Sequence, residues 1–215
     1  MGKTDLPKLI SYEDSRLLVA LKPSGLLSVP GRGPDKQDCL ISRVQADYPE
    51  ALVVHRLDQG TSGLVLFARD KECQRLLGRQ FEEKRVRKEY EALLLGKLAK
   101  REGLVEYFQR LDPDNRPHQI IDPLQGKSGI TEWKVLEENQ KGSGPLSRVR
   151  FFPRTGRTHQ LRLHARELGA PIAGDALYGQ GVNEEFPRLM LHAAFIEFIH
   201  PGTGERVTFS SEVPF

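Results

Sequence analysis

Cysteine is scarce in this 215-residue sequence, and the two that are present, Cys39 and Cys73, have neither metal-binding nor redox spacing. We therefore expect reduced thiols that pack in the core, as in a reducing compartment. The first residues, MGKTDLPKLI, contain no apolar run like that of a signal peptide, and no stretch approaches the roughly 20 apolar residues of a membrane span. The sequence thus predicts a cytoplasmic protein with no membrane partner.

Several catalytic and ligand-binding motifs are also missing. The sequence has no HExxH or CxxC motif, and His159 and His164 are five residues apart, which places them on different faces of a helix. The string GTSG does not match the G-x-S-x-G of serine hydrolases, and HRLD lacks the Gly-rich and D-F-G motifs that accompany a kinase loop. Because P-loop and dinucleotide signatures are absent too, we expect no metal, no cofactor and no bound nucleotide.

Positive charge is concentrated in one part of the chain. Residues 148–166 contain six arginines and no acid, and because the net charge of +3 includes these six, the rest of the chain carries −3. Residues 84–88, KRVRK, form a second basic cluster. A local basic region on a mildly acidic body is typical of a protein that binds a polyanion, although charge runs are also common on solvated faces.

The sequence VVHRLDQGTSGLVLFAR, residues 53–69, places a polar segment between two apolar runs. The flanks predict buried strands, at 51–57 and 64–68, so the loop between them is held at both ends. Asp58 would lie on this loop beside a low-dielectric core, with Arg56 two positions earlier. Either Asp58 has a chemical role or it is an ordinary turn residue that bonds backbone amides.

The pattern of the chain predicts an α+β fold with a mostly antiparallel mixed sheet and peripheral helices, because expected strands outnumber helices and short turns join most of them. We expect a single domain over 1–215, with two lobes that meet near the Pro/Asn/Gly-rich segment 112–129. Asp70 is expected to cap a helix on which Cys73, Leu77 and Phe81 recur. Residues 36–47 predict a further helix, and the other expected strands cover 86–95, 103–111, 130–137, 146–153, 189–199 and 205–209.

The string RTGRTHQLRLHARELGAP, residues 154–171, predicts a helix that ends at Gly169 and Pro171. Thr155 or Thr158 is expected to cap its N-terminus. Three basic side chains then share one face of this helix because of their three- and four-residue spacing, namely His159, Arg162 and Arg166.

Five blocks together resemble the RluA family of pseudouridine synthases: KPSGLLSVPGR, HRLDQGTSGLVLFAR, RKEYEALLLG, RTGRTHQLRLHARELGAPIAGDALYG and LMLHA. They occur in the family's order over residues 17 to about 200. The chain is most similar to the short members, which lack a separate N-terminal RNA-binding domain. The resemblance implies a pseudouridine synthase fold with a central catalytic cleft, and isomerisation of specific uridines in structured RNA. The implied substrates are large-subunit ribosomal RNA, the anticodon arm of transfer RNA, or both.

The resemblance also implies roles for individual residues. Asp58 matches the catalytic aspartate, and Tyr90 matches a tyrosine that lies against the uracil ring, although an aromatic residue on a strand is commonly a core residue. Arg162 matches the arginine expected to pair with Asp58; its alternative is a contact to phosphate. Arg56 matches a residue that fills the gap left by a flipped base, or else contacts phosphate. We expect further RNA-backbone contacts from Arg32, Lys84, Arg85, Arg154 and Arg157.

Two other functions remain open at this point. The chain could be a non-catalytic RNA-binding protein or RNA chaperone on the same fold, or a hydrolytic N-glycosidase that releases free uracil. The combination of Asp58, Tyr90 and Arg162 favours catalysis, because binding alone does not require it. RNA is the expected partner, and we expect a monomer.

Overall fold

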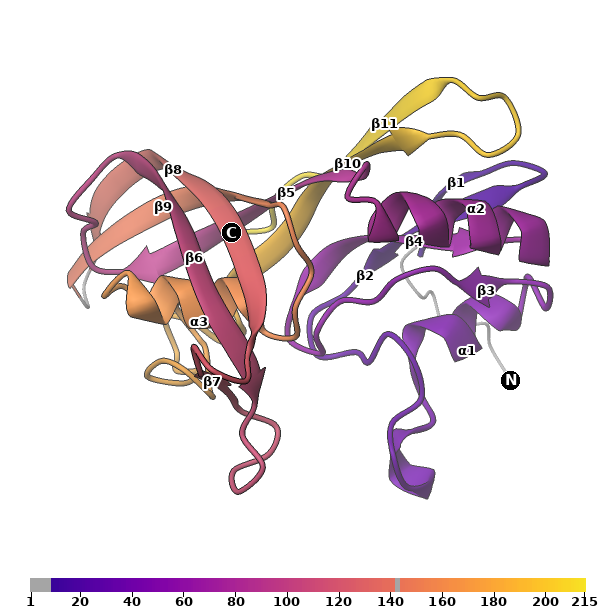
Figure 1. Ribbon diagram of the computed structural model, residues 1–215. Coiled ribbons are helices and arrows are strands. Elements are labelled where there is room, and N and C mark those ends of the chain that lie inside the picture. Colours follow the sequence, from indigo (N-terminus) through magenta and orange to yellow (C-terminus); the bar gives the residue numbers. More distant parts are fainter. Residues whose placement is uncertain (1–8, 142–143) are drawn as a thin grey trace. The chain divides into compact units, whose positions relative to one another are not determined.

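The computed structural model describes residues 9–141 and 144–215, which divide into two compact units (Figure 1). Unit 1 contains the chain up to Val86 together with Ile196–Ser211, and unit 2 contains Arg87–Phe195 and Glu212–Phe215. The segment 112–129, where the sequence suggested that two lobes meet, lies within unit 2. A single catalytic domain without a separate RNA-binding domain stays a prediction.

Unit 1 is an antiparallel sheet with two helices. Its strands β1, β2 and β4 are adjacent, with β3 paired to β4 and β11 to β10. The apolar faces of β2, β4 and the second helix form one core with Ile196 and Phe198. The elements are β1 (Ile10–Glu13), β2 (Leu17–Lys22), η1 (Pro34–Lys36), α1 (Leu40–Gln45), β3 (Leu52–Val53), β4 (Ser62–Ala68), α2 (Lys71–Glu82), β11 (Arg206–Ser210) and the second half of β10 (Leu191–Ile199).

Helix α2 confirms the expected cap, because the Asp70 carboxylate accepts a hydrogen bond from Cys73 N–H at 2.8 Å. Cys73 and Leu77 face the core, and Phe81 packs against it.

Two elements expected from the sequence are shorter in the structure. The helix expected at 36–47 is only α1, where Cys39 and Ser42 form the N-terminal cap. The buried strand expected at 51–57 is the two-residue, half-buried β3, since the chain leaves the sheet before the polar segment.

Unit 2 is an antiparallel sheet in the order β5-β9-β8-β6-β7 with one helix, α3. Its core contains Trp133, Val149 and Phe151 from the strands and Leu161 and Ala165 from α3. The elements are β5 (Arg87–Leu95), β6 (Glu102–Leu111), β7 (Gln119–Ile121), β8 (Lys127–Lys141), β9 (Gly144–Pro153), α3 (Gln160–Glu167) and the first half of β10. These strands and helices confirm the α+β class.

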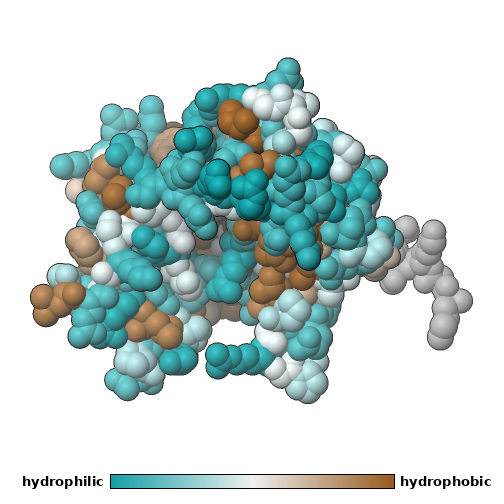
Figure 2. Space-filling view, turned by 45° about the vertical axis from the view of Figure 1, so that its right-hand side comes forward, coloured by the Kyte–Doolittle hydropathy of each residue, from teal (hydrophilic) through white to brown (hydrophobic). Residues whose placement is uncertain are grey.

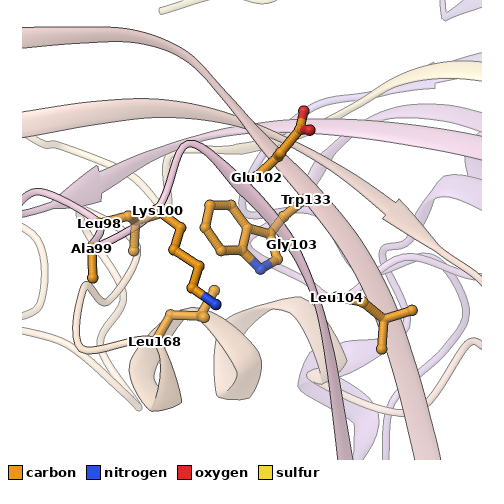
Figure 3. Close-up of a pocket in the computed structure, with 8 residues that line it drawn as sticks. All are labelled: Leu98, Ala99, Lys100, Glu102, Gly103, Leu104, Trp133 and Leu168. Atoms are coloured by element: carbon orange, nitrogen blue, oxygen red, sulfur yellow. The ribbon is translucent and has the colours of Figure 1, made fainter.

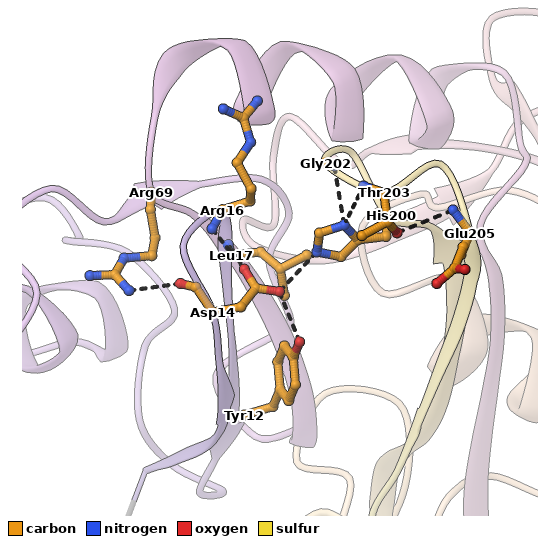
Figure 4. A network of polar contacts seen from close by, with 9 residues as sticks. All are labelled: Tyr12, Asp14, Arg16, Leu17, Arg69, His200, Gly202, Thr203 and Glu205. Atoms are coloured by element: carbon orange, nitrogen blue, oxygen red, sulfur yellow. Dashed lines mark hydrogen bonds and ion pairs between the residues drawn. The ribbon is translucent and has the colours of Figure 1, made fainter.

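Asp14 and His200 join two turns of unit 1 that are distant in sequence (Figure 4). His200 Nε2 lies 2.8 Å from Asp14 Oδ2. His200 Nδ1 accepts hydrogen bonds from the backbone N–H groups of Gly202 and Thr203, both at 3.1 Å, so the ring proton is on Nε2 and is donated to Asp14. This contact holds the C-terminal segment of unit 1 to its N-terminal strands.

Hydrophilic side chains cover most of the face seen in Figure 2, and the apolar side chains there form small separate patches. Within residues 9–141 and 144–215, no helix has the length and apolar character needed to cross a membrane.

Two buried histidines in unit 2 link its stability to pH. Burial lowers the pKa of His164 from 6.5 to about 4, and burial together with the charge of Arg188 lowers the pKa of His192 to about 4. The unfolded chain binds protons below pH 6.5, whereas the folded chain does not until about pH 4, so stability falls as the pH drops through this window. From pH 7 to pH 5 we expect a loss of about 2 kcal/mol for each histidine.

Denaturant unfolding of the wild type and His164→Asn at pH 7 and pH 5 checks this expectation. An asparagine amide does not titrate and can still bond the Thr131 hydroxyl, which lies 3.0 Å from His164 Nδ1. The variant should therefore lose about 2 kcal/mol less than the wild type between the two pH values. An identical loss in both proteins would show that His164 does not contribute.

Candidate active site

Asp58 lies on the connection between β3 and β4 in unit 1 and is half-buried. The Asp58 carbonyl accepts a hydrogen bond from Thr61 N–H at 3.1 Å, which closes a turn just before β4. Every residue of β4 is buried, so the chain after the turn is fixed by the core. The sequence therefore correctly predicted a loop held by a buried strand on its C-terminal side.

Hydroxyl groups from the segment after β2 fix the loop on both sides of Asp58. Ser28 Oγ accepts a hydrogen bond from Leu57 N–H at 3.0 Å and donates one to Leu57 C=O at 2.8 Å. Ser24 Oγ donates to Gly60 C=O at 2.6 Å. The main chain is thus held one residue before and two residues after the carboxylate.

Lys22, the last residue of β2, is 0% exposed and stabilises the same loop from the protein interior. Its ammonium group donates hydrogen bonds to the carbonyl groups of Pro23 at 3.0 Å, Leu26 at 2.6 Å and Gln59 at 2.9 Å. A buried charge needs such partners, and these carbonyl dipoles supply them. Lys22 therefore joins its own segment to the residue next to Asp58.

The N-terminal part of the loop is fixed by His55. Its Nε2 accepts a hydrogen bond from Leu66 N–H at 3.0 Å, and its ring stacks on Phe81 of α2 with centroids 4.7 Å apart. Arg56, the next residue, is exposed. The loop therefore presents an exposed arginine and a half-buried carboxylate two residues apart on a fixed main chain.

Tyr90 lies on β5 in unit 2, opposite Phe151 of β9, and is half-buried. It packs against the core cluster that contains Leu161 of α3. Glu89 and Glu91 lie on the opposite face of the strand from Tyr90 and are 8% exposed each. The two carboxylates are covered by Arg87 of the same strand and by Arg148 and Arg150 of β9.

Arg162 on α3 is buried and forms a two-point ion pair with Asp175. Its Nε lies 2.8 Å from Asp175 Oδ2 and its Nη2 lies 2.6 Å from Asp175 Oδ1. Burial raises the pKa of the Asp175 carboxyl, but the hydrogen bonds and charge of Arg162, with backbone N–H groups of Leu177 and Tyr178, outweigh it and hold the pKa below its ordinary value. Sequence reasoning missed Asp175, whose one signal was its place in the string GDALYG.

The three basic residues expected on one face of α3 converge on Tyr178, which confirms that expectation. The guanidinium carbons of Arg162 and Arg166 lie 5.2 Å and 5.6 Å from the centroid of the Tyr178 ring. His159 Nδ1 lies 2.9 Å from Tyr178 Oη, which also accepts a hydrogen bond from Gln119 N–H at 2.7 Å.

The expected cap of α3 was wrong. The N-cap residue is His159, in the left-handed region at φ 54°, and its side chain makes no capping hydrogen bond. Thr155 instead donates to the Gln160 side chain at 2.8 Å, and the same amide oxygen accepts from Arg157 N–H at 2.9 Å. A glutamine inside the helix therefore organises the turn that a capping threonine was expected to stabilise.

The basic residues expected to contact RNA are exposed on both units. Lys84 lies two residues after the end of α2, in the left-handed region at φ 58°, and Arg85 pairs with Glu83 at 3.0 Å. Arg157 Nε donates to Ser128 C=O at 3.0 Å. Of these basic residues, unit 1 contains Arg32, Arg56, Lys84 and Arg85, and unit 2 contains Arg154 and Arg157.

Many arginines of the 148–166 region are already paired with acids. Arg150 Nη2 lies 2.6 Å from Glu91 and Arg148 Nη1 lies 3.3 Å from the same carboxylate. Arg154 pairs with Glu132, Arg162 with Asp175 and Arg166 with Glu167. The positive charge that this region can offer a polyanion is therefore smaller than its sequence indicates.

The predicted catalytic residues are divided between the units. Tyr90 and Arg162 lie in unit 2 on elements that share a core, and Asp58 lies in unit 1. The pairing of Arg162 with Asp58 stays a prediction.

An open cavity of about 320 Å³ in unit 2 contains none of these residues (Figure 3). Its walls are mainly apolar and include Leu98, Leu104, Leu168 and the Trp133 ring, together with Lys100 and Glu102. In the part of the chain that the structure describes, no three His, Cys, Asp or Glu side chains are grouped to hold a metal ion.

The model of the family described as RNA pseudouridylate synthase matches residues 16–167, a range that includes Asp58, Tyr90 and Arg162. The chain belongs to the RNA pseudouridylate synthase family. The dual-specificity RNA pseudouridine synthase RluA of Yersinia pestis is 42% identical over 96% of this chain and 100% of the relative. The protein of the same name from Escherichia coli K12 is 42% identical over 96% of this chain and 94% of the relative.

A solved structure supports the same membership. Human RNA pseudouridylate synthase domain containing 1 is 31% identical, with a TM-score of 0.78 over 96% of this chain and 83% of that protein. Membership favours the catalytic interpretation over the non-catalytic RNA-binding alternative.

Proposed function

We propose that this chain isomerises specific uridines to pseudouridine in structured RNA, with ribosomal RNA and the anticodon arm of transfer RNA both as substrates. The observation that carries the proposal is identity of 42% along nearly the whole chain to relatives named as dual-specificity RNA pseudouridine synthases. The fixed loop of Asp58 supports it, because a catalytic carboxylate must be held in place.

In the proposed reaction the N1–C1′ glycosidic bond of the uridine breaks, the uracil turns, and a C5–C1′ bond forms. C5 loses its proton and N1, which carries none in uridine, gains one, so the composition of the RNA is unchanged. Asp58 serves as the nucleophile or as the base toward the ribose. Exclusion of water prevents hydrolysis of the glycosidic bond to free uracil.

The other proposed roles follow from the chemistry of each side chain. Arg162 stabilises the ionised form of Asp58, and Tyr90 lies against the uracil and assists loss of the C5 proton. Arg56 occupies the gap left by a uridine that is flipped out of the RNA. The exposed residues Arg32, Lys84, Arg85, Arg154 and Arg157 contact the RNA backbone. We further propose that the protein acts as a monomer in the cytoplasm and uses no nucleotide cofactor.

Tritium release from RNA labelled at C5 of uridine tests the proposal, because each isomerisation exchanges that hydrogen with water. Unmodified transcripts of 23S ribosomal RNA and of transfer RNAs are incubated separately with the purified protein. We expect release from both, at one or a few positions that pseudouridine mapping identifies. Release from neither would contradict the proposed activity, and release from one would contradict the dual specificity.

Chromatography of the same reactions distinguishes the rival chemistry. Free uracil in proportion to the tritium released would identify a hydrolytic N-glycosidase. We expect pseudouridine in the RNA and no free uracil.

A further inference from the structure

We infer that Asp175 is a positioning residue for the reaction and acts through Arg162. The inference rests on the proposed function, in which Arg162 stabilises the charge of Asp58. Asp175 is completely buried, and its carboxylate accepts four hydrogen bonds, two from Arg162 and one each from the backbone N–H groups of Leu177 at 2.9 Å and Tyr178 at 3.1 Å. The carboxylate is therefore itself rigidly held.

The pair fixes the orientation of the Arg162 guanidinium. Asp175 binds the edge formed by Nε and Nη2, and the Tyr178 ring lies against the group at 5.2 Å. Tyr178 is in turn held by Gln119 N–H and His159. The guanidinium has a second pair of N–H donors, formed by Nη1 and the outer hydrogen of Nη2. Because one edge of this planar group is bound and one face is covered, the direction of that second pair is fixed.

The same pair argues against a phosphate contact for Arg162. Its side chain is only 8% exposed, and the Asp175 carboxylate offsets its charge within hydrogen-bonding distance. An arginine that attracts RNA backbone does so with an accessible and uncompensated charge. The buried pair is better suited to directing hydrogen bonds than to general attraction.

Stability alone is a weak reason for such a pair. The desolvation of two buried charges commonly cancels their attraction, and an apolar pair of similar volume is often as stable. Orientation of a functional group is what a two-point arginine–carboxylate pair supplies and an apolar pair does not.

Asp175→Asn tests the inference with little change of shape. The asparagine Oδ1 can still accept from Leu177, Tyr178 and Arg162 Nη2, but the amide –NH₂ takes the place of Oδ2 and cannot accept from Arg162 Nε. The two-point hold and the negative charge are therefore both lost. We expect kcat for tritium release to fall roughly 100-fold, as for a misplaced catalytic group, while KM and the Kd for RNA stay within about threefold.

Asp122 provides a matched control in the same unit. Its carboxylate accepts one hydrogen bond from Arg110 Nε and two from the backbone N–H groups of Leu124 and Gln125, both at 3.0 Å. The backbone contacts two and three residues ahead match those at Asp175, and the arginine contact is one-point instead of two-point. Asp122→Asn loses the same kind of ion pair away from Arg162. We expect lower thermal stability in this variant with kcat unchanged.

The outcomes separate the inference from the proposed function. An inactive wild type contradicts the proposed function. If the wild type is active and Asp175→Asn has the same kcat, the positioning role is overturned while the proposed function stands. An equal loss of kcat in Asp122→Asn and Asp175→Asn also overturns the positioning role. If Asp175→Asn does not fold, Asp175→Glu keeps the charge and moves the carboxylate by one methylene; a wild-type kcat in that variant would also overturn the inference.

Discussion

Replacement of Asp58 by asparagine is expected to lower the rate of tritium release by roughly 10⁴-fold or more, because the amide can act neither as a nucleophile nor as a base. The fold should survive this substitution. The hydrogen bonds that fix the loop around Asp58 use main-chain atoms of Leu57, Gln59 and Gly60, which the variant keeps. RNA affinity should stay within about threefold of the wild type.

Single-turnover tritium release and filter binding with the same RNA measure the two quantities separately. Asp47→Asn, at an exposed aspartate of unit 1, is the control for loss of one negative charge and should be as active as the wild type. Substantial activity of Asp58→Asn would show that another residue performs the chemistry. If Asp58→Asn lost RNA affinity to the same degree as activity, the role of Asp58 would be to bind RNA or to maintain the RNA-binding surface.

Replacement of Arg162 by methionine is expected to have two effects, one on turnover and one on stability. In the proposed mechanism Arg162 stabilises the ionised form of Asp58, so turnover should be lost. Stability should fall by about 3–5 kcal/mol, because Asp175 is left as an unpaired charge in a buried site. Urea unfolding measures the second effect, and tritium release at a temperature where the variant is folded measures the first.

The double variant Arg162→Met/Asp175→Asn separates the two effects. It removes the unpaired charge and keeps an acceptor for the Leu177 and Tyr178 N–H groups, so most of the stability should return while turnover stays lost. Its kcat should equal that of Arg162→Met, since Asp175 acts through the arginine. If Arg162→Met loses RNA affinity and turnover equally, the arginine is a phosphate contact.

Local patterns in the sequence predicted the features that depend on neighbouring residues. The cap of α2 by Asp70 and the shared face of His159, Arg162 and Arg166 follow from spacings of three and four residues, and the structure confirms both. The loop of Asp58 was recognisable because the buried strand β4 follows it directly. These are contacts that helix and strand periodicity alone determine.

Contacts between distant residues were not predictable in this way. Arg150 meets Glu91 because strand register aligns β5 with β9, and nothing in the 148–166 region indicates that acids from elsewhere cover it. Lys22 supports the Asp58 loop from 37 residues away through backbone carbonyls, which leave no sequence signal. The prediction of the α3 cap failed for a different, local reason, because the Gln160 side chain binds the Thr155 hydroxyl and Arg157 N–H.

The contact between Asp14 and His200 has a consequence for the order of folding during synthesis. Unit 1 begins the chain, yet its last strand and this contact require Ile196–Ser211, which the ribosome makes after nearly all of unit 2. Domains generally fold as the chain emerges, N-terminal part first. Strand β11 and the Asp14–His200 contact of unit 1 can therefore form only after most of unit 2 has been synthesised. The contacts that fix the Asp58 loop, in contrast, all lie within residues 22–81, so they can form before unit 2 is made.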